Sequence, residues 1–428
     1  MSFRSKFLLV VFSASLALYG VVGGWMSISA QQQTNDPGAQ LRIFESVLKH
    51  INDDYVDEPD MGKVRAGALR GLAYGLDPYS TYLTPEQVRD YRAGAAANQV
   101  GIGAELSQLS SYLYVIAPVK GGPAEQAGLQ PGDIIEYIDN KATRDISLYD
   151  ARQVLGGAPG TEVKLRVLRA GTRPFVVTVR RGGVQVPVAE TRTEAGRVGV
   201  IKVNSLDEGE AADVKARLQE LLKAGSQKIL LDLRSVAGGS LTEAVKVANL
   251  FIREGNLAQT IGRGNKPLKT FAAEPKDFVF DGPAAVLIDR GTAAAAEVVA
   301  SAFAESKRGE VIGVKSFGAG AEQQLFTLRN GDGLLLTTIK WASSAGKPFL
   351  GAGVAPTVEV KNPELAEAVD PEDLTGNDDD PIAQPDAQDE QREPANEPAK
   401  PKQPREDVQL KRALEVLREK QPAAPKAS

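Results

Sequence analysis

Apolar positions follow three different spacings along the chain, and each spacing predicts a different kind of structure. Between residues 39 and 91 they recur every three or four positions, which is typical of helices with one buried face. The clearest stretches are 41–51 and 64–73, and Gly75 and Pro78 end the second of them. Thr84 followed by Pro85 predicts the start of another helix.

From residue 101 the apolar residues fall into short runs separated by Gly and Pro turns. The runs predict strands at 112–117, 133–138, 163–168 and 175–180 and short helices at 123–127 and 148–155. About 80 residues of this pattern indicate a small barrel-like β-domain with two helices.

From residue 197 continuous apolar runs alternate with helical stretches. Strands are predicted at 198–203, 228–233, 284–288 and 311–314, and helices at 208–223, 242–252 and 293–304. This alternation predicts a mostly parallel sheet covered on both faces. The fold class is therefore α+β with several domains.

The two ends of the chain have compositions of their own. Arg4 and Lys6 precede an apolar run at 7–26 and the residues SISA at 27–30, which predicts a secretory signal or an uncleaved membrane anchor. Both alternatives place the folded part outside the cytoplasm, in the periplasm or cell envelope.

Between residues 364 and 397 there are thirteen acids and one base, and eight prolines lie between 363 and 404. Such a segment cannot bury enough apolar surface to fold, so 361–407 is predicted to be disordered. Residues 408–420 predict a short amphipathic helix.

The residue inventory excludes several chemistries. The chain has no cysteine and one histidine, His50, so thiol nucleophiles, disulfides and zinc fingers are impossible. A Ser-His-Asp triad would have to use His50, which we expect on a solvated helix face. We expect no cofactor and no metal, and the mildly basic body shows no motif for nucleic acid.

Six motifs occur in a recognisable order. They are LDPYS at 76–80, GIGA at 101–104, GLQPGDII at 128–135, DLR at 232–234 with GG at 238–239, GTAAAAE at 291–297, and SFGAG at 316–320. In order and spacing they resemble the carboxyl-terminal processing peptidases, the tail-specific family of serine proteases that carry a PDZ domain.

The resemblance implies a domain order. It is a signal peptide or anchor (1–30), a helical N-terminal domain (39–98), a PDZ domain (99–182), a peptidase core (190–360), a disordered linker (361–407) and a short C-terminal helix (408–420).

The resemblance breaks down at the catalytic residues. The family uses a Ser-Lys dyad, in which a serine at a helix N-terminus gives its proton to a desolvated lysine. Here Ala294 stands at the nucleophile position and Ala319, 25 residues later, at the lysine position. Since alanine has neither a hydroxyl nor an amine, the resemblance implies a degenerate peptidase. Further departures at 236–237 and Ala296 favour natural divergence over deliberate substitution, although both stay open.

Other residues are assigned by the same resemblance. Gly238 and Gly239 match the oxyanion and substrate turn, Gln323 a helper position, and Glu305 a position where the family often has Asp. A relocated dyad would have to use hydroxyls or amines nearby. The candidates are Thr292, Ser316, Lys315, Lys340 and Lys347. Thr292 is more simply interpreted as a helix N-cap, and the lysines as solvated side chains.

The PDZ-like stretch keeps what tail binding needs. PDZ domains add an extended peptide to a sheet edge and hold its terminal carboxylate in a nest of amides. The predicted amide loop is Gly101, Ile102, Gly103 and Ala104, and the predicted apolar walls are Ile102, Leu106, Leu148, Ala151 and Leu155. We expect the partners to be free carboxyl termini with an apolar last residue.

Three functions therefore remain. The first is an extracytoplasmic pseudoprotease that binds protein tails. The second is an active endopeptidase cleaving near protein carboxyl termini with relocated residues. The third is a structural envelope tether that uses the anchor and the acidic tail.

Overall fold

The computed structural model describes residues 37–93, 100–109, 111–144, 146–361 and 406–419. The chain divides into two units, Met1–Leu69 and Arg70–Ser428. The first holds helix α2 (Pro37–Asp54) and most of α3 (Met61–Tyr74), where the periodicity predicts helices. The buried face expected for the first of them is not seen, because its apolar side chains are exposed: Leu41, Ile43, Phe44, Val47 and Leu48. Within the described residues no helix is both long and apolar enough to cross a membrane. The predicted signal or anchor and most of the predicted disordered linker lie outside the described part.

The second unit begins with the end of α3, strand β1 (Thr81–Leu83) and helix α4 (Pro85–Ala93). The predicted start of α4 is confirmed. The Thr84 hydroxyl accepts from the Gln87 amide at 3.3 Å, and the Gln87 side chain accepts from the Thr84 amide at 3.0 Å. This reciprocal pair satisfies two amides that a helix start would otherwise leave unpaired.

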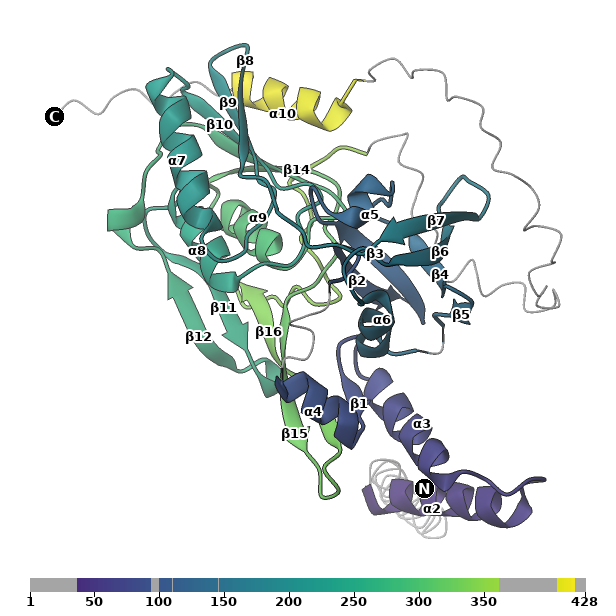
Figure 1. The fold of residues 1–428 in the computed structure, drawn as a ribbon. Coiled ribbons are helices and arrows are strands. Elements are labelled where there is room, and N and C mark those ends of the chain that lie inside the picture. Colours follow the sequence, from purple (N-terminus) through teal and green to yellow (C-terminus); the bar gives the residue numbers. More distant parts are fainter. Residues whose placement is uncertain (1–36, 94–99, 110, 145, 362–405, 420–428) are drawn as a thin grey trace, which may run out of the picture. The chain divides into compact units, whose positions relative to one another are not determined.

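The PDZ domain contains a sheet in the order β2-β3-β4-β6-β7, with β5 paired to β4 (Figure 1). Its strands are β2 (Ala104–Leu109), β3 (Tyr112–Pro118), β4 (Ile134–Ile138), β5 (Lys141–Ala142), β6 (Glu162–Leu168) and β7 (Phe175–Arg180). Its helices are α5 (Pro123–Gln126) and α6 (Leu148–Leu155). Strand β2, which the sequence pattern did not predict, forms an edge of this sheet.

The peptidase core is built on a second sheet, in the order β17-β14-β13-β10-β9-β8. Its strands are β8 (Glu190–Glu194), β9 (Val198–Lys202), β10 (Lys228–Asp232), β13 (Ala284–Ile288), β14 (Gly309–Gly313) and β17 (Val358–Glu359). All neighbouring pairs are parallel except β8 with β9.

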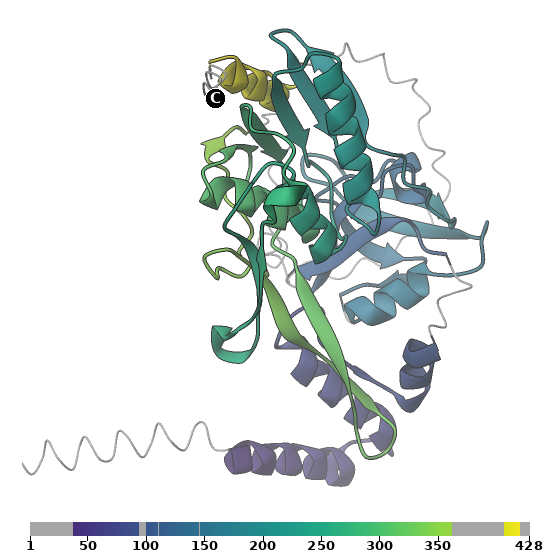
Figure 2. The same ribbon diagram turned by 90° about the vertical axis from the view of Figure 1, so that its left-hand side faces the viewer.

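Helices cover both faces of this parallel sheet. Because β9, β10, β13 and β14 are neighbours in chain order, right-handed crossovers place their connecting helices on one face. Those helices are α7 (Glu210–Lys223), α8 (Leu241–Asn249) and α9 (Ala295–Glu305). The opposite face is covered by α10 (Val408–Glu419), the yellow helix of Figures 1 and 2. Coverage of both faces was predicted, but the sequence pattern did not indicate that α10 covers the second face.

A third sheet, which is antiparallel, was not predicted. Its order is β1-β16-β11-β12, and β15 pairs with β16 to form a long hairpin (Figure 2). The strands are β11 (Asn256–Ile261), β12 (Pro267–Ala272), β15 (Ala321–Thr327) and β16 (Gly333–Ser343), and two 3₁₀ turns, η2 (Arg263–Asn265) and η3 (Pro275–Asp277), accompany them. The α+β fold class is confirmed.

Candidate functional site

Ala294 lies on a strained turn between strand β13 and helix α9. Its φ of 52° and ψ of −109° fall in a region that residues with a side chain rarely adopt. Such a conformation costs on the order of 1–3 kcal/mol and persists only where neighbouring contacts impose it. A sharp, strained strand-to-helix turn is also how α/β hydrolases present a nucleophile. The backbone thus has the shape of a nucleophile turn, although Ala294 carries no nucleophile.

The structure brings Ala319 to the same place. The amides of Ala294 and Ala319 both donate to Oε2 of Glu297, each at 2.8 Å. Two amides on one oxygen must be close neighbours, so the two residues assigned to the dyad positions lie together although 25 residues separate them. Both are nearly buried, at 8% and 6% exposure.

Glu297 joins the two turns. Its other oxygen accepts from the Ser316 hydroxyl at 2.5 Å and from the Gly318 amide at 2.8 Å. Burial raises the pKa of Glu297 to about 7, while the hydrogen bonds from Ser316, Ala319, Ala294 and Gly318 act in the opposite direction. From sequence, this residue is only an acid in the first turn of a helix, and the pattern gave no sign of its role.

The glycine turn is linked to the same two segments. Gly238 and Gly239 have φ of 79° and 85°. A side chain on Gly239 would place its Cβ 2.8 Å from the carbonyl oxygen of Leu206, so only glycine fits there. The Gly238 carbonyl accepts from the amide of Ala295 at 3.1 Å. The turn assigned to the oxyanion therefore lies directly against the turn that carries Ala294.

Gln323 and Glu305 have different surroundings. The Gln323 amide group donates to the hydroxyl of Thr337 at 3.3 Å, and that hydroxyl donates to Asp77 of the LDPYS motif at 3.0 Å. Glu305 is at the far end of α9, roughly 16 Å along the helix from Ala294. It accepts from the hydroxyls of Ser343 and Ser344 and from the Ala345 amide. Glu305 therefore stabilises the turn at 343–345 and lies away from the positions assigned to the dyad.

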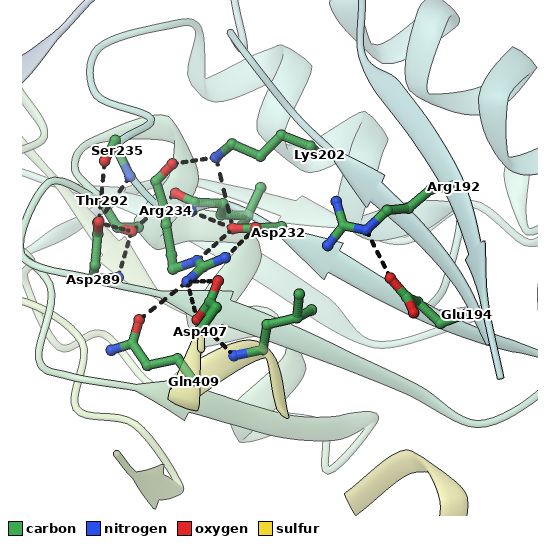
Figure 3. Close-up of polar contacts among 12 residues, drawn as sticks. Arg192, Glu194, Lys202, Asp232, Arg234, Ser235, Asp289, Thr292, Asp407 and Gln409 are labelled. Carbon is green, nitrogen blue, oxygen red and sulfur yellow. Dashed lines mark hydrogen bonds and ion pairs between the residues drawn. The ribbon is translucent and has the colours of Figure 1, made fainter. Parts of the chain in front are cut away.

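The hydroxyls considered for a relocated nucleophile are used by the fold. Thr292 is fully buried; its hydroxyl donates to the Leu233 carbonyl and accepts from the Asp289 amide, both at 2.9 Å (Figure 3). Its interpretation as a helix N-cap is wrong, because Ala294 occupies the N-cap position. Ser316 is also buried and bonds Glu297 and the Val354 amide.

The amines considered as a base and the single histidine stand elsewhere. Lys315 and Lys347 are exposed, as expected, and Lys340 pairs with Ala321 across the β15–β16 ladder at intermediate exposure. His50 is exposed on α2, where its ring bonds Asp54 at 2.6 Å.

The loop assigned to carboxylate binding is fixed by its carbonyl groups. The carbonyls of Gly101, Ile102 and Gly103 accept from the amides of Gly182, Ala124 and Val119. Within the residues that the structure describes, the amides of Ile102 and Gly103 donate to no protein acceptor. Gly103 has φ of 68°, and a Cβ there would be 2.8 Å from a methyl group of Val184. The loop therefore offers free amides at the end of edge strand β2.

The residues predicted to form the apolar walls belong to one buried cluster of this domain, and their part in peptide binding stays a prediction. The cluster includes Ile102, Leu106, Leu148, Ala151 and Leu155, and Ala104 packs against it. Tyr79 of the LDPYS motif also packs on this cluster, and burial raises the pKa of its hydroxyl. Arg152 of α6 and Glu105 of β2 form an ion pair of 3.6 Å beside it. Among the described residues, no group of three or more acidic or histidine side chains could hold a metal.

Comparison with known proteins assigns both domains. The model of Peptidase family S41 matches residues 197–360, and that of the PDZ domain matches residues 114–169. The carboxy-terminal processing protease CtpA of Bacillus subtilis (strain 168) is 30% identical over 83% of this chain and 76% of its own length. A probable CtpA-like serine protease of Staphylococcus aureus (strain MSSA476) is 34% identical over 76% of this chain, and the match spans 66% of that relative.

A solved structure agrees. The photosystem II D1 C-terminal processing protease superposes with a TM-score of 0.63 and 26% identity, covering 75% of this chain and 92% of that one. Two domain models, relatives at 30% identity or more and one superposed structure give the same assignment. The chain belongs to Peptidase family S41, among the CtpA-like carboxy-terminal processing proteases that carry a PDZ domain.

Proposed function

We propose that this chain is a non-cleaving member of its family that binds the carboxyl-terminal tails of other proteins through its PDZ domain. The observation that carries the proposal is the contrast at Ala294 and Ala319. Glu297 holds the backbone of both residues together, and the family resemblance assigns them to the dyad, yet neither side chain can attack a peptide bond or accept a proton.

The size of the chemical loss supports this reading. Removing one nucleophile or base from a well-studied serine protease lowers turnover by about 10⁶. What an oxyanion site and binding retain is on the order of 10³ over water. The contacts of Thr292 and Ser316 do not favour a relocated nucleophile, because both hydroxyls are buried and already bonded.

Tail binding is supported by the loop and the groove together. A terminal carboxylate is an acceptor of two or more hydrogen bonds, and the Ile102 and Gly103 amides are free donors next to each other. The peptide would extend along β2, an edge strand of its sheet, with its last side chain directed toward the apolar cluster. Affinity should be roughly micromolar, because few residues are buried and the peptide must be ordered.

A titration with matched peptides tests the tail-binding function. We expect a peptide with an apolar last residue and a free carboxyl group to bind the full chain more tightly than its amide by about 1–3 kcal/mol. Gly103→Ala should weaken binding at least about tenfold, because it adds strain and a clash at the loop. Gly183→Ala, a nearby position with open space and no positive φ, is the matched control. Equal affinity for acid and amide would overturn the proposal.

We also propose that the folded part works outside the cytoplasm, attached to or exported through the membrane by residues 1–30. Two basic residues followed by the apolar run 7–26 support this. Fusion of a reporter that folds only after export, placed after residue 361, tests it. An active reporter is expected, and loss of its activity when 7–26 is deleted would link export to this segment. An inactive reporter in the unaltered chain would contradict the proposal.

A further inference from the structure

The parallel sheet of the core has one face that its own crossover helices leave bare. Side chains alternate across each strand, so Ile229 and Leu231 of β10 face α7, α8 and α9, whereas Leu230 faces the opposite side. The centre of the second face is apolar, with Val198, Val200, Leu230, Ala285, Leu287 and Ile312 in one cluster. A bare apolar face of this size would be a liability for aggregation.

Helix α10 covers that face. Ala413, Leu414, Val416 and Leu417 belong to the same cluster as the strand residues. The ammonium group of Lys228 donates to the carbonyls of Leu417 and Arg418, at 2.7 and 3.1 Å. Lys228 thus caps the last turn of α10, where a cation also interacts favourably with the negative end of the helix dipole. The helix is held by apolar contacts along its length and by polar contacts at both ends.

The first turn of α10 is anchored to the end of β10. The Asp407 carboxylate accepts from the Leu410 amide at 3.0 Å and forms an ion pair with Arg234 at 2.8 Å (Figure 3). Arg234 also makes two side-chain bonds to Asp232, at 3.0 and 2.8 Å. Although burial alone would raise it, Lys202 and Arg234 together lower the pKa of Asp232 below its usual value. This charge network fixes Arg234 between α10 and the sheet.

Arg234 is directly followed by the two turns of the candidate site. Ser235 has a left-handed φ of 57°, and both its amide and its hydroxyl donate to Asp289, at 2.8 and 3.1 Å. Asp289 in turn accepts from the Gly291 amide at 2.9 Å, and its backbone amide donates to the Thr292 hydroxyl at 2.9 Å. A continuous series of contacts therefore runs from Asp407 to the turn that bears Ala294 (Figure 3).

We propose that the segment 406–419 is a tethered ligand of the sheet's second face, and that its docking holds Ser235, which precedes the glycine turn, and Ala294 in their strained positive-φ conformations. Strained backbone persists only where surrounding contacts impose it. Arg234 is the side chain through which the docked helix reaches that backbone. The face of the sheet that α10 covers fits an amphipathic helix. Such a helix needs an acidic residue at its start to bind Arg234 and free carbonyls in its last turn to accept from Lys228.

Hydrogen–deuterium exchange of the full chain tests the coupling. Leu417→Asp places a charge in the apolar contact and should release α10. We expect exchange to speed up at least about tenfold in α10, and also in the turns 235–239 and 289–294, while α7 stays unchanged. Lys411→Ala, on the exposed side of the same helix, is the matched control and should change neither turn.

Loss of α10 in Leu417→Asp could destabilise the whole core, so a second variant and an added peptide are needed to separate that effect from local coupling. Asp407→Asn keeps the capping oxygen but removes the charge that Arg234 binds, so α10 should stay protected while the turns exchange about threefold faster. A synthetic peptide of residues 406–419 should slow exchange in the turns of Leu417→Asp again.

Two results would overturn the proposal. One is release of α10 in Leu417→Asp with unchanged turns. The other is rapid exchange of α10 in the unaltered chain. Neither measurement involves tail peptides or cleavage, so the inference stands or fails separately from the proposed function.

Discussion

The Ala294 turn and the PDZ-like loop differ in which groups they offer to a ligand or substrate. At Ala294 the backbone has a strained conformation, a buried carboxylate that accepts from the amides of both residues assigned to the dyad, and a glycine turn in contact, while alanine at those two positions offers no hydroxyl and no amine. In the PDZ-like loop the Ile102 and Gly103 amides are free among the described residues, and the residues predicted as apolar walls lie in the buried core of that domain. The arrangement of the backbone at 294 and 319 is therefore independent of the side chains there, because Glu297 binds backbone amides and makes no use of those side chains.

The strongest test of this contrast restores the missing groups. Ala294→Ser with Ala319→Lys supplies a hydroxyl and an amine on neighbouring backbone positions, and we expect cleavage of an unfolded protein at least about 10³-fold above the unaltered chain. Each single variant should stay at background, since a serine without a base and a lysine without a nucleophile are both inactive. Cleavage by the unaltered chain that Thr292→Ala abolishes would instead identify a relocated nucleophile.

Removing the buried carboxylate should damage the scaffold more than any side chain at the dyad positions. Glu297→Ala leaves the donors of Ala294, Ala319, Gly318 and Ser316 without a protein acceptor, and we expect a loss of about 3–5 kcal/mol in the free energy of unfolding. Glu305→Ala, whose partners are partly solvated, is the matched control and should cost about 1–2 kcal/mol. Equal losses in chemical denaturation would show that Glu297 has no special role.

The protonation of Glu297 should make the free energy of unfolding depend on pH. Its pKa is about 7 in the folded chain against 4.5 for an unburied glutamate, so the folded state binds the extra proton between these values. Stability from this group is then highest below about pH 4.5 and falls as the pH rises through 7, by about 3 kcal/mol in all. Denaturation of the unaltered chain and of Glu297→Gln between pH 5 and 8 measures it. A difference that does not change with pH would contradict the raised pKa.

Local pattern in the sequence predicted most of the core but little of what connects its parts. Strands such as β13 are continuous apolar runs, and their positions were predicted closely. The antiparallel sheet was missed because β1, β11 and β16 come from three distant stretches, and the three residues of β1 are too few to give a strand pattern.

The same distinction holds at the site. The motif order assigned the dyad positions to Ala294 and Ala319 from spacing along the chain, and that assignment stays a prediction, although the fold brings the two residues together. The role of Glu297 and the docking of α10 depend on contacts across 20 to 190 residues, such as Lys228 with Arg418, which no local spacing encodes. The domain boundaries stay predictions, and so do the roles of the individual groove residues in peptide binding.

The smallest effect is expected at His50, and it would sharpen the comparison by excluding a third kind of chemistry. His50 is exposed, its partner Asp54 is one turn away on the same helix, and such a pair contributes about 0.3–0.5 kcal/mol. His50→Ala should therefore change the free energy of unfolding by less than about 0.5 kcal/mol. In the Ala294→Ser, Ala319→Lys background it should leave the cleavage rate within about twofold, because His50 lies on the exposed helix α2 and holds no part of the candidate site. A loss of cleavage on this substitution would mean that the restored serine borrows a histidine, and the lysine position would then not be the base.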